Sequence, residues 1–239
     1  MGHGWQGAVL KLMRGKDFTL TVRSNERLSD RLHRLSFSDG GMLRATGVHP
    51  TMWVRLWFDN GGRPHQRAYT LVDPDPAEGT FSMDFALHSG RASDWARAAH
   101  PGATIEATVQ GSEFAPPDPP PSRLLVVGDA ASRPAIDSLL GSMPLTPATV
   151  WYETSHVCDS DHAPRVGTAS REVVHVPRRD KGAHLIETVR AALPERVDDA
   201  SYLWIACDTA TTRALASFAR KQLGVPTERL HALGYWRAT

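Results

Sequence analysis

The sequence predicts two domains: an antiparallel six-stranded β-barrel over residues 1–115 and an α/β domain with a parallel sheet over residues 123–239. Short runs that alternate apolar and polar side chains dominate the first half, whereas apolar strands alternate with helical patterns in the second. Between the halves, the segment EFAPPDPPPSRLL contains five prolines. Prolines can neither donate to a sheet ladder nor continue a helix, so we expect an extended connector there.

In the first domain, the periodicity predicts strands that are bounded by Gly, Asp, Asn and Pro. These strands cover residues 17–24, 31–37, 52–58, 67–72, 79–88 and 104–109. In the run MWVRLWF, Trp53 and Arg55 should point to one face of the sheet, and Val54 and Leu56 to the other. One helix is expected over residues 92–100, capped by Ser93 or by the preceding Gly-Arg pair.

In the second domain, strands and helices alternate. Strands are expected at residues 123–129, 148–155, 172–177, 201–208 and 229–236, and helices at 132–143, 181–195 and 209–224. Pro134 is tolerable in the first turn of its helix, and Gly224 should end the last one. Continuous apolar strands of this kind belong to a parallel sheet that is covered on both faces.

Bulk composition restricts the function. The 239 residues carry a net charge of +1, from 27 basic and 26 acidic side chains, which argues against a nucleic-acid partner. No apolar run is long enough for membrane insertion, and the N-terminus lacks a signal pattern. Two cysteines, Cys158 and Cys207, do not make a disulfide framework. We therefore expect a cytoplasmic protein, and nothing in the sequence demands more than a monomer.

The stretch RAYT places three different polar groups near the end of one predicted strand. Arg67 and Tyr69 share a face, and Thr70 looks the other way unless the strand twists or ends there. A guanidinium provides a fork for phosphate, a tyrosine ring can lie against an aromatic ligand, and a hydroxyl or N–H at Thr70 can reach a ring edge. The alternative is a solvent-facing strand in which Tyr69 is ordinary barrel packing.

The stretch FALHSGRASDWA (85–96) reads as a strand, a glycine turn and a helix start. The N–H groups of Arg91, Ala92 and Ser93, together with the Ser93 hydroxyl, would form an anion site that fits a pyrophosphate. The alternative is a simple helix cap. Placed after the RAYT strand in the same barrel, this turn supplies the second half of a flavin dinucleotide site.

The order of the motifs resembles the siderophore-interacting protein family, which are flavin reductases of the ferredoxin-reductase type. The resemblance runs from about Thr19 to Arg237 and rests on Arg67–Thr70, the turn 88–93, VVGDAASRPAI (126–136), YLWIACD (202–208) and the terminal GYWR (234–237). It implies FAD in the first domain, NAD(P)H in the second, and a ferric siderophore as the substrate. Nicotinamide would pass a hydride to the flavin, which would return electrons singly to the ferric chelate.

The resemblance also implies roles for single residues. Cofactor contacts are expected at Arg67, Ala68, Tyr69, Thr70, Leu87, His88, Gly90, Arg91, Ala92, Ser93, Asp129, Cys207 and Trp236. Arg55 and Arg237, with Arg91, are the cations expected to attract an anionic chelate. No side chain is assigned a catalytic role, and no metal ligand is expected.

Four positions depart from the family pattern: Val72, Arg91, Ala130 and Cys207. Val72 stands where a second arginine is usual, and Arg91 stands in a phosphate loop that is one residue shorter. These departures keep two alternatives open. One is a family member recruited to natural-product biosynthesis on a secondary metabolite, which binds FAD but uses NAD(P)H weakly or not at all. The other is a non-catalytic binding protein.

Several residues have competing interpretations. Cys207 is either core packing or a thiol near the nicotinamide, and Trp236 either lies against the flavin or caps the core of the second domain. The loop 155–162 is rich in His, Cys and Asp, but its spacing favours a solvated loop over a metal site. The substrate and the choice between NADH and NADPH are not determined, although Arg165, Arg178 and Arg179 are candidates for a 2′-phosphate.

Overall fold

The computed structural model describes residues 15–155, 163–167 and 170–237. The chain divides into two compact units, residues 1–114 and 115–239. The first contains an antiparallel sheet and the second a parallel one, which confirms the predicted fold class. The loop 156–162, with its candidate metal ligands, lies outside the described residues. Within the described part of the chain, no helix is long and apolar enough to cross a membrane.

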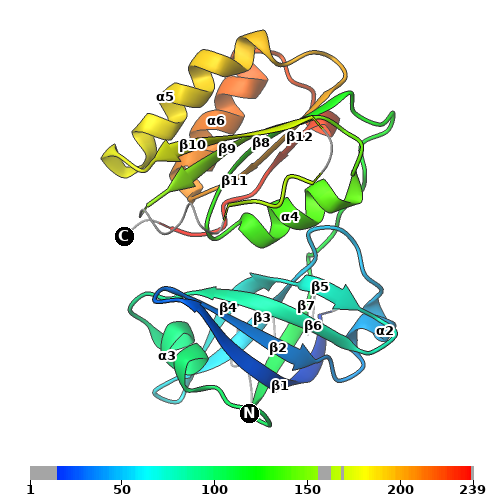
Figure 1. Ribbon diagram of the computed structural model, residues 1–239, viewed down its shortest axis with the longest axis vertical. Helices are drawn as coiled ribbons and strands as arrows, with labels where there is room; N and C mark the ends of the chain where they lie inside the picture. Colours follow the sequence, from blue (N-terminus) through cyan, green and yellow to red (C-terminus); the bar gives the residue numbers. More distant parts are fainter. Residues whose placement is uncertain (1–14, 156–162, 168–169, 238–239) are drawn as a thin grey trace. The chain divides into compact units, whose positions relative to one another are not determined.

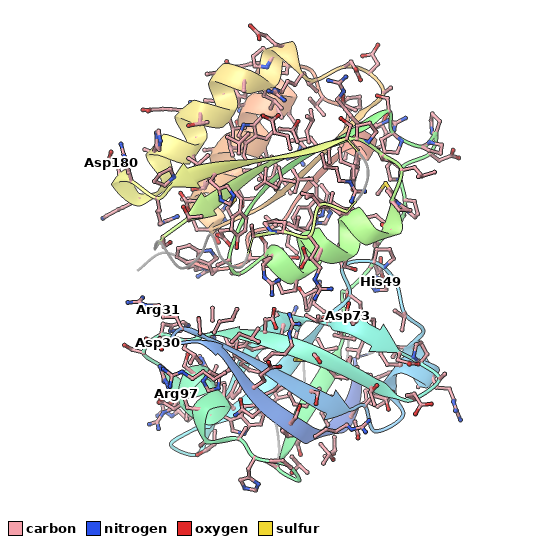
Figure 2. The ribbon with its side chains drawn as sticks, viewed as in Figure 1. Asp30, Arg31, His49, Asp73, Arg97 and Asp180 are labelled. Atoms are coloured by element: carbon pink, nitrogen blue, oxygen red, sulfur yellow. The ribbon has the colours of Figure 1, made fainter. Side chains whose placement is uncertain are left out.

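The first unit is a curled antiparallel sheet in the strand order β4-β3-β7-β1-β2-β6-β5 (Figure 1). The strands are β1 (Lys16–Ser29), β2 (Leu32–Ser38), β3 (Trp53–Asn60), β4 (Arg63–Thr70), β5 (Val72–Asp75), β6 (Thr80–Ala86) and β7 (Thr104–Val109), and the helices are α2 (Met42–Thr46) and α3 (Arg91–Ala98). The turn between β1 and β2 is marked by Asp30 and Arg31 in Figure 2. The curl brings the edge strand β4 back towards β6, as the contact between the rings of Tyr69 in β4 and Phe85 in β6 shows. The result is a half-barrel.

The predicted count of six strands in this unit is wrong, because the predicted strand 67–72 is two strands. β4 ends at Thr70 and pairs with β3, whereas β5 begins at Val72 and pairs with β6. Between them, Leu71 is buried, and its N–H donates to the carbonyl of Met52 over 2.8 Å. The apolar run is unbroken at this crossing, so the periodicity alone does not show it.

Strand alternation places the core of the half-barrel as predicted. Val54 and Leu56 are fully buried, whereas Trp53 and Arg55 share the other face of β3. The guanidinium carbon of Arg55 lies 4.8 Å from the centre of the Trp53 ring, which is a cation–π contact. One face of β3 therefore packs in the core, and the other carries the partly exposed Trp53 and Arg55.

The second unit is a parallel sheet in the order β10-β9-β8-β11-β12, covered by α4 on one face and by α5 and α6 on the other (Figure 1). The strands are β8 (Arg123–Asp129), β9 (Ala148–Thr154), β10 (Arg171–Pro177), β11 (Ser201–Ala206) and β12 (Leu230–Ala232), and the helices are α4 (Arg133–Ser142), α5 (Ala183–Ala192) and α6 (Thr209–Gln222). Short 3-10 turns are η2 (Asp180–Gly182), η3 (Leu193–Glu195) and η4 (Thr227–Arg229), and Figure 2 labels Asp180 in the first of them. The strand order reverses between β8 and β11, and open α/β sheets bind ligands beside such a reversal, at the carboxyl ends of the strands.

The predicted last strand, 229–236, is wrong in its length, since β12 holds only three residues. The chain beyond it still follows β11, because the N–H of Tyr235 donates to the carbonyl of Cys207. Gly234 lies so close to helix α6 that a Cβ atom there would stand 2.8 Å from Oγ1 of Thr209. Beyond Gly234, the segment forms an isolated parallel bridge between Trp236 and Asp208.

Candidate functional site

Two of the predicted motifs, which are far apart in sequence, meet on the half-barrel. The Tyr69 ring lies with its centre 4.3 Å from that of Phe85, and Phe85 lies 5.9 Å from Trp95 of α3. Phe58 packs edge-on against Tyr69 and Trp95. This aromatic cluster fixes the end of β4 beside the start of α3.

The side chains of Arg67–Thr70 become less exposed from the first residue to the last. Arg67 and Ala68 are exposed, Tyr69 is half-buried and Thr70 is buried. The Arg67 guanidinium donates only to the neighbouring carbonyl of Gln66, over 2.8 Å, and pairs with no carboxylate in the described part of the chain. Burial raises the pKa of Tyr69, so its phenol stays neutral. A neutral ring beside an exposed, unpaired guanidinium suits a ligand that is aromatic at one end and anionic at the other.

The turn before α3 supplies backbone donors. Gly90 has a φ of +138°, a conformation that favours glycine, and no side chain caps the helix that follows. The N–H groups of Arg91, Ala92 and Ser93 therefore have no acceptor within the described residues, whereas that of Asp94 donates to the carbonyl of Gly90. The buried Ser93 hydroxyl accepts from the N–H of His88 over 3.1 Å, and this bond holds the turn closed.

The other residues predicted in this turn have structural contacts as well. Nε of Arg91 donates to Oδ1 of Asn60 over 3.2 Å, and the His88 ring bonds the carbonyl of Ser89. Leu87 and Ala92 are buried in the core of the half-barrel. The combination of free N–H groups, an exposed arginine and a partly exposed ring fits the phosphates and ring system of FAD. The individual FAD contacts stay predictions.

Three buried carboxylates lie at the carboxyl edge of the parallel sheet, and one guanidinium pairs with two of them. Asp129 ends β8, Glu153 is the next-to-last residue of β9 and Asp208 follows β11; they are 6%, 2% and 1% exposed. Arg178, which follows β10, donates to Oε2 of Glu153 and, at 3.5 Å, to Oδ2 of Asp208. The other Glu153 oxygen, Oε1, is buried and has no hydrogen-bond partner among the described residues. One cation does not neutralise three buried carboxylates, so this edge holds a proton more readily than an exposed surface does.

Asp129 connects this cluster to Trp236. Nε1 of Trp236 donates to Oδ2 of Asp129 over 2.7 Å, and the Arg178 guanidinium lies 4.9 Å from the centre of the Trp236 ring. Burial raises the pKa of Asp129 to about 6, helped by the nearby Glu153 and opposed by the bond from Trp236. These contacts hold Trp236 at the carboxyl edge of the sheet. Its relation to a flavin stays a prediction.

The geometry separates the remaining predicted residues. Cys207 is fully buried in the core, and burial raises the pKa of its thiol well above the usual range. Burial therefore favours the packing interpretation of Cys207. Arg237 is exposed, whereas Nε of Arg55 is buried and has no hydrogen-bond partner in the part of the chain that the structure describes.

Sequence reasoning missed Glu153 and gave Arg178 a different task. Arg178 was a candidate for a 2′-phosphate, but it lies between two buried carboxylates. The available signal was position: in a parallel sheet, polar residues that follow buried strands meet at one edge. Asn60, which bonds Arg91, was also missed, and no motif marks it.

The raised pKa of Asp129 predicts how the stability of the second unit depends on pH. Because this pKa is higher in the folded chain than the ordinary 3.8, protonation favours folding. The contribution is complete below about pH 4 and is lost as the pH rises through about 6. We expect Asp129→Asn, which keeps an acceptor for Trp236, to lose this part of the pH dependence. Denaturant unfolding between pH 4 and pH 8 measures it, and parallel curves for wild type and variant would contradict it.

Sequence comparison assigns both units. The family described as siderophore-interacting FAD-binding domain matches residues 26–111, and the family described as siderophore-interacting protein matches residues 121–239. The chain belongs to the siderophore-interacting protein family. Its first unit is accordingly an FAD-binding domain.

Named relatives agree with this assignment. The siderophore-interacting chain is 32% identical to the mycobactin import ATP-binding/permease protein IrtA of Mycolicibacterium thermoresistibile, over 99% of this chain but only 26% of that protein. It thus spans about a quarter of the length of that relative. It is also 23% identical to the ferric acinetobactin reductase of Acinetobacter baumannii, over 79% of this chain and 67% of the relative.

Solved structures share the fold. A siderophore-interacting protein of Acinetobacter baumannii superimposes with a TM-score of 0.78 at 21% identity, covering 93% of this chain and 90% of the other. A ferredoxin NADP+ reductase of Neisseria gonorrhoeae, with bound FAD and NADP, gives 0.66 at 13% identity, covering 92% and 99%. The fold of this siderophore-interacting protein is therefore ferredoxin-reductase-like.

Proposed function

We propose that this protein is an FAD-dependent NAD(P)H oxidoreductase that reduces a ferric siderophore. The observation that carries the proposal is the meeting of the Arg67–Thr70 strand with the uncapped start of α3 on an FAD-binding half-barrel. The ferric acinetobactin reductase among its relatives supports the reaction type. Bound FAD would supply the redox chemistry, accepting an electron pair from NAD(P)H and passing electrons singly to the ferric chelate.

The residues of the first unit bind and orient the cofactor in this proposal. Arg67 would hold a phosphate, since its fork has donors to spare, and the N–H groups at the start of α3 would hold the pyrophosphate. Tyr69 would lie against the ring system, held in place by Phe85 behind it. Thr70, buried at the end of β4, would present its hydroxyl or N–H to the ring edge.

The second unit would bind NAD(P)H at the carboxyl edge of its sheet. Asp129 and Arg178 fix the position of Trp236 from two sides, so a flat aromatic surface is available there without reorganisation. An anionic ferric chelate needs cations nearby for binding, and the candidates are Arg55, Arg91 and Arg237. Among these, Arg91 and Arg237 are exposed.

The absorption spectrum of the purified chain tests the proposal. We expect flavin bands that bleach when NADPH or NADH is added without oxygen and that return when a ferric catecholate or hydroxamate is added. The ferrous product is measured with a ferrous-specific chelator, and a reaction without protein is the control.

Two results would replace the proposal by the alternatives. Flavin bands that persist under NADPH and NADH indicate a flavoprotein recruited to other chemistry. No flavin bands, even after addition of FAD, indicate a non-catalytic binding protein.

A further inference from the structure

A groove of about 610 Å³ runs between helix α6 and the segment that follows β12. All of its lining residues lie between Thr209 and Arg237, so the groove belongs to the second unit alone. Its volume is within the range of small-molecule sites. β12, which contributes Ala232 to the lining, is the edge strand of the sheet, and the lining also includes Trp236, which contacts Asp129 and Arg178.

The groove is strongly basic although the chain as a whole is nearly neutral. No carboxylate is among the described residues that line it. Four cations are: Arg213, Arg220, Lys221 and Arg237. All four are exposed, and in the described part of the chain none of them forms an ion pair. Together they create a local field that attracts anions.

The helix macrodipole of α6 explains the position of only some of these cations. Arg220 and Lys221 lie in the last turn of α6, where the helix macrodipole favours cations. Arg213 lies in the second turn, where the macrodipole gives it no such advantage. Its position on α6 is instead that of a groove residue, four residues before Ser217 and seven before Arg220, so all three lie on one helix face.

Hydroxyl and aromatic groups complete the lining. The exposed Ser217 hydroxyl lies between the two arginines on α6. Tyr235 and Trp236 add aromatic surface, and the Tyr235 ring is braced edge-on by Trp204 at 6.1 Å. Two guanidinium forks with a hydroxyl between them match the oxygens of a phosphate group better than a single carboxylate, and four cations match a multiply charged anion.

We propose that the groove between α6 and the segment after β12 binds a phosphate-bearing ligand, with Arg213, Ser217 and Arg220 on the phosphate and Tyr235 beside its organic part. All of the lining residues belong to the second unit, and Trp236, which Asp129 and Arg178 contact at the carboxyl edge of the sheet, is one of them. The phosphate can belong to a nucleotide, to a lipid headgroup or to free diphosphate.

Calorimetric titration of the full chain, saturated with FAD, tests this site with inorganic pyrophosphate and with ADP. We expect binding that weakens at least tenfold in Arg213→Gln/Arg220→Gln, because glutamine keeps the helix propensity and removes the charge. Arg123→Gln is the matched control, since Arg123 is an exposed arginine at the amino end of β8. It should bind as the wild type does.

The source of the phosphate is distinguished by three arms of the experiment. Tighter binding of ADP than of pyrophosphate indicates a nucleotide, and equal binding indicates free diphosphate. A lipid headgroup is indicated if the wild-type protein sediments with phosphatidylglycerol vesicles but not with phosphatidylcholine vesicles. The double variant should then no longer sediment with phosphatidylglycerol vesicles. The proposal is overturned if no probe binds, or if the double variant and the Arg123 control bind all probes alike.

Discussion

Replacing Arg67 by alanine should weaken FAD binding roughly 10- to 150-fold while leaving the fold intact. The loss of a charge-assisted, two-pronged contact costs about 1.5–3 kcal/mol, which corresponds to that factor. The fold should tolerate the change, because the Arg67 side chain is exposed and, among the described residues, donates only to the carbonyl of its neighbour. Fluorescence titration of the flavin-free chain with FAD measures the affinity, and thermal unfolding checks the fold.

The half-barrel offers a matched control on the same strand. Arg63 is exposed and lies four residues before Arg67 on β4, so both point to the same face of the strand. Arg63→Ala removes the same charge from the same face of the strand, about 13 Å away, and we expect it to change FAD affinity little. Arg67→Lys should fall between wild type and Arg67→Ala, since lysine keeps the charge without the fork. If Arg63→Ala and Arg67→Ala bind FAD equally well, Arg67 does not hold the phosphate.

The fold was predictable where side-chain periodicity and packing agree. In β3, alternation separates the buried Val54 and Leu56 from Trp53 and Arg55. β8 reads as a buried strand because residues 124–127 form a continuous apolar run. Prediction failed where long-range geometry decides. The break at Leu71 depends on a carbonyl in another part of the chain, that of Met52, which no local pattern shows.

The two parts of the candidate site differ in the same way. The motifs of the half-barrel are short and continuous, so their residues could be named from sequence and chemistry. The cluster joins Arg178 to Glu153 and Asp208, which lie 25 and 30 positions away in the sequence, and it depends on the order of the parallel strands. In the sequence alone, Arg178 cannot be distinguished from the other arginines. The sequence therefore shows which groups are available, and the sheet decides which of them meet.

Replacing Arg178 by methionine should cost the second unit about 3–5 kcal/mol of unfolding free energy at pH 8, because it leaves buried carboxylates without their cation. The side chains of Glu153 and Asp208 are each 1% exposed, and that of Arg178 is 16% exposed, so water cannot replace the lost partner. Arg196→Met is the control in the same unit: the Arg196–Glu172 pair is 38% and 56% exposed, and such pairs contribute up to about 1 kcal/mol. Denaturant unfolding measures both variants.

The pH dependence identifies the cause of the loss. Burial already raises the pKa of Glu153, and Arg178 opposes that rise. Without Arg178 the pKa should rise further, so the folded variant takes up a proton at a higher pH than the wild type does. A group with a raised folded-state pKa is stabilising at low pH and loses that effect as the pH rises. The deficit of Arg178→Met should therefore be small at pH 5 and grow towards pH 8, and Glu153→Gln in the same chain should restore part of the stability by removing one buried charge. A deficit that is equal at both pH values and unchanged by Glu153→Gln would mean that Arg178 stabilises the unit by packing on Trp236 alone.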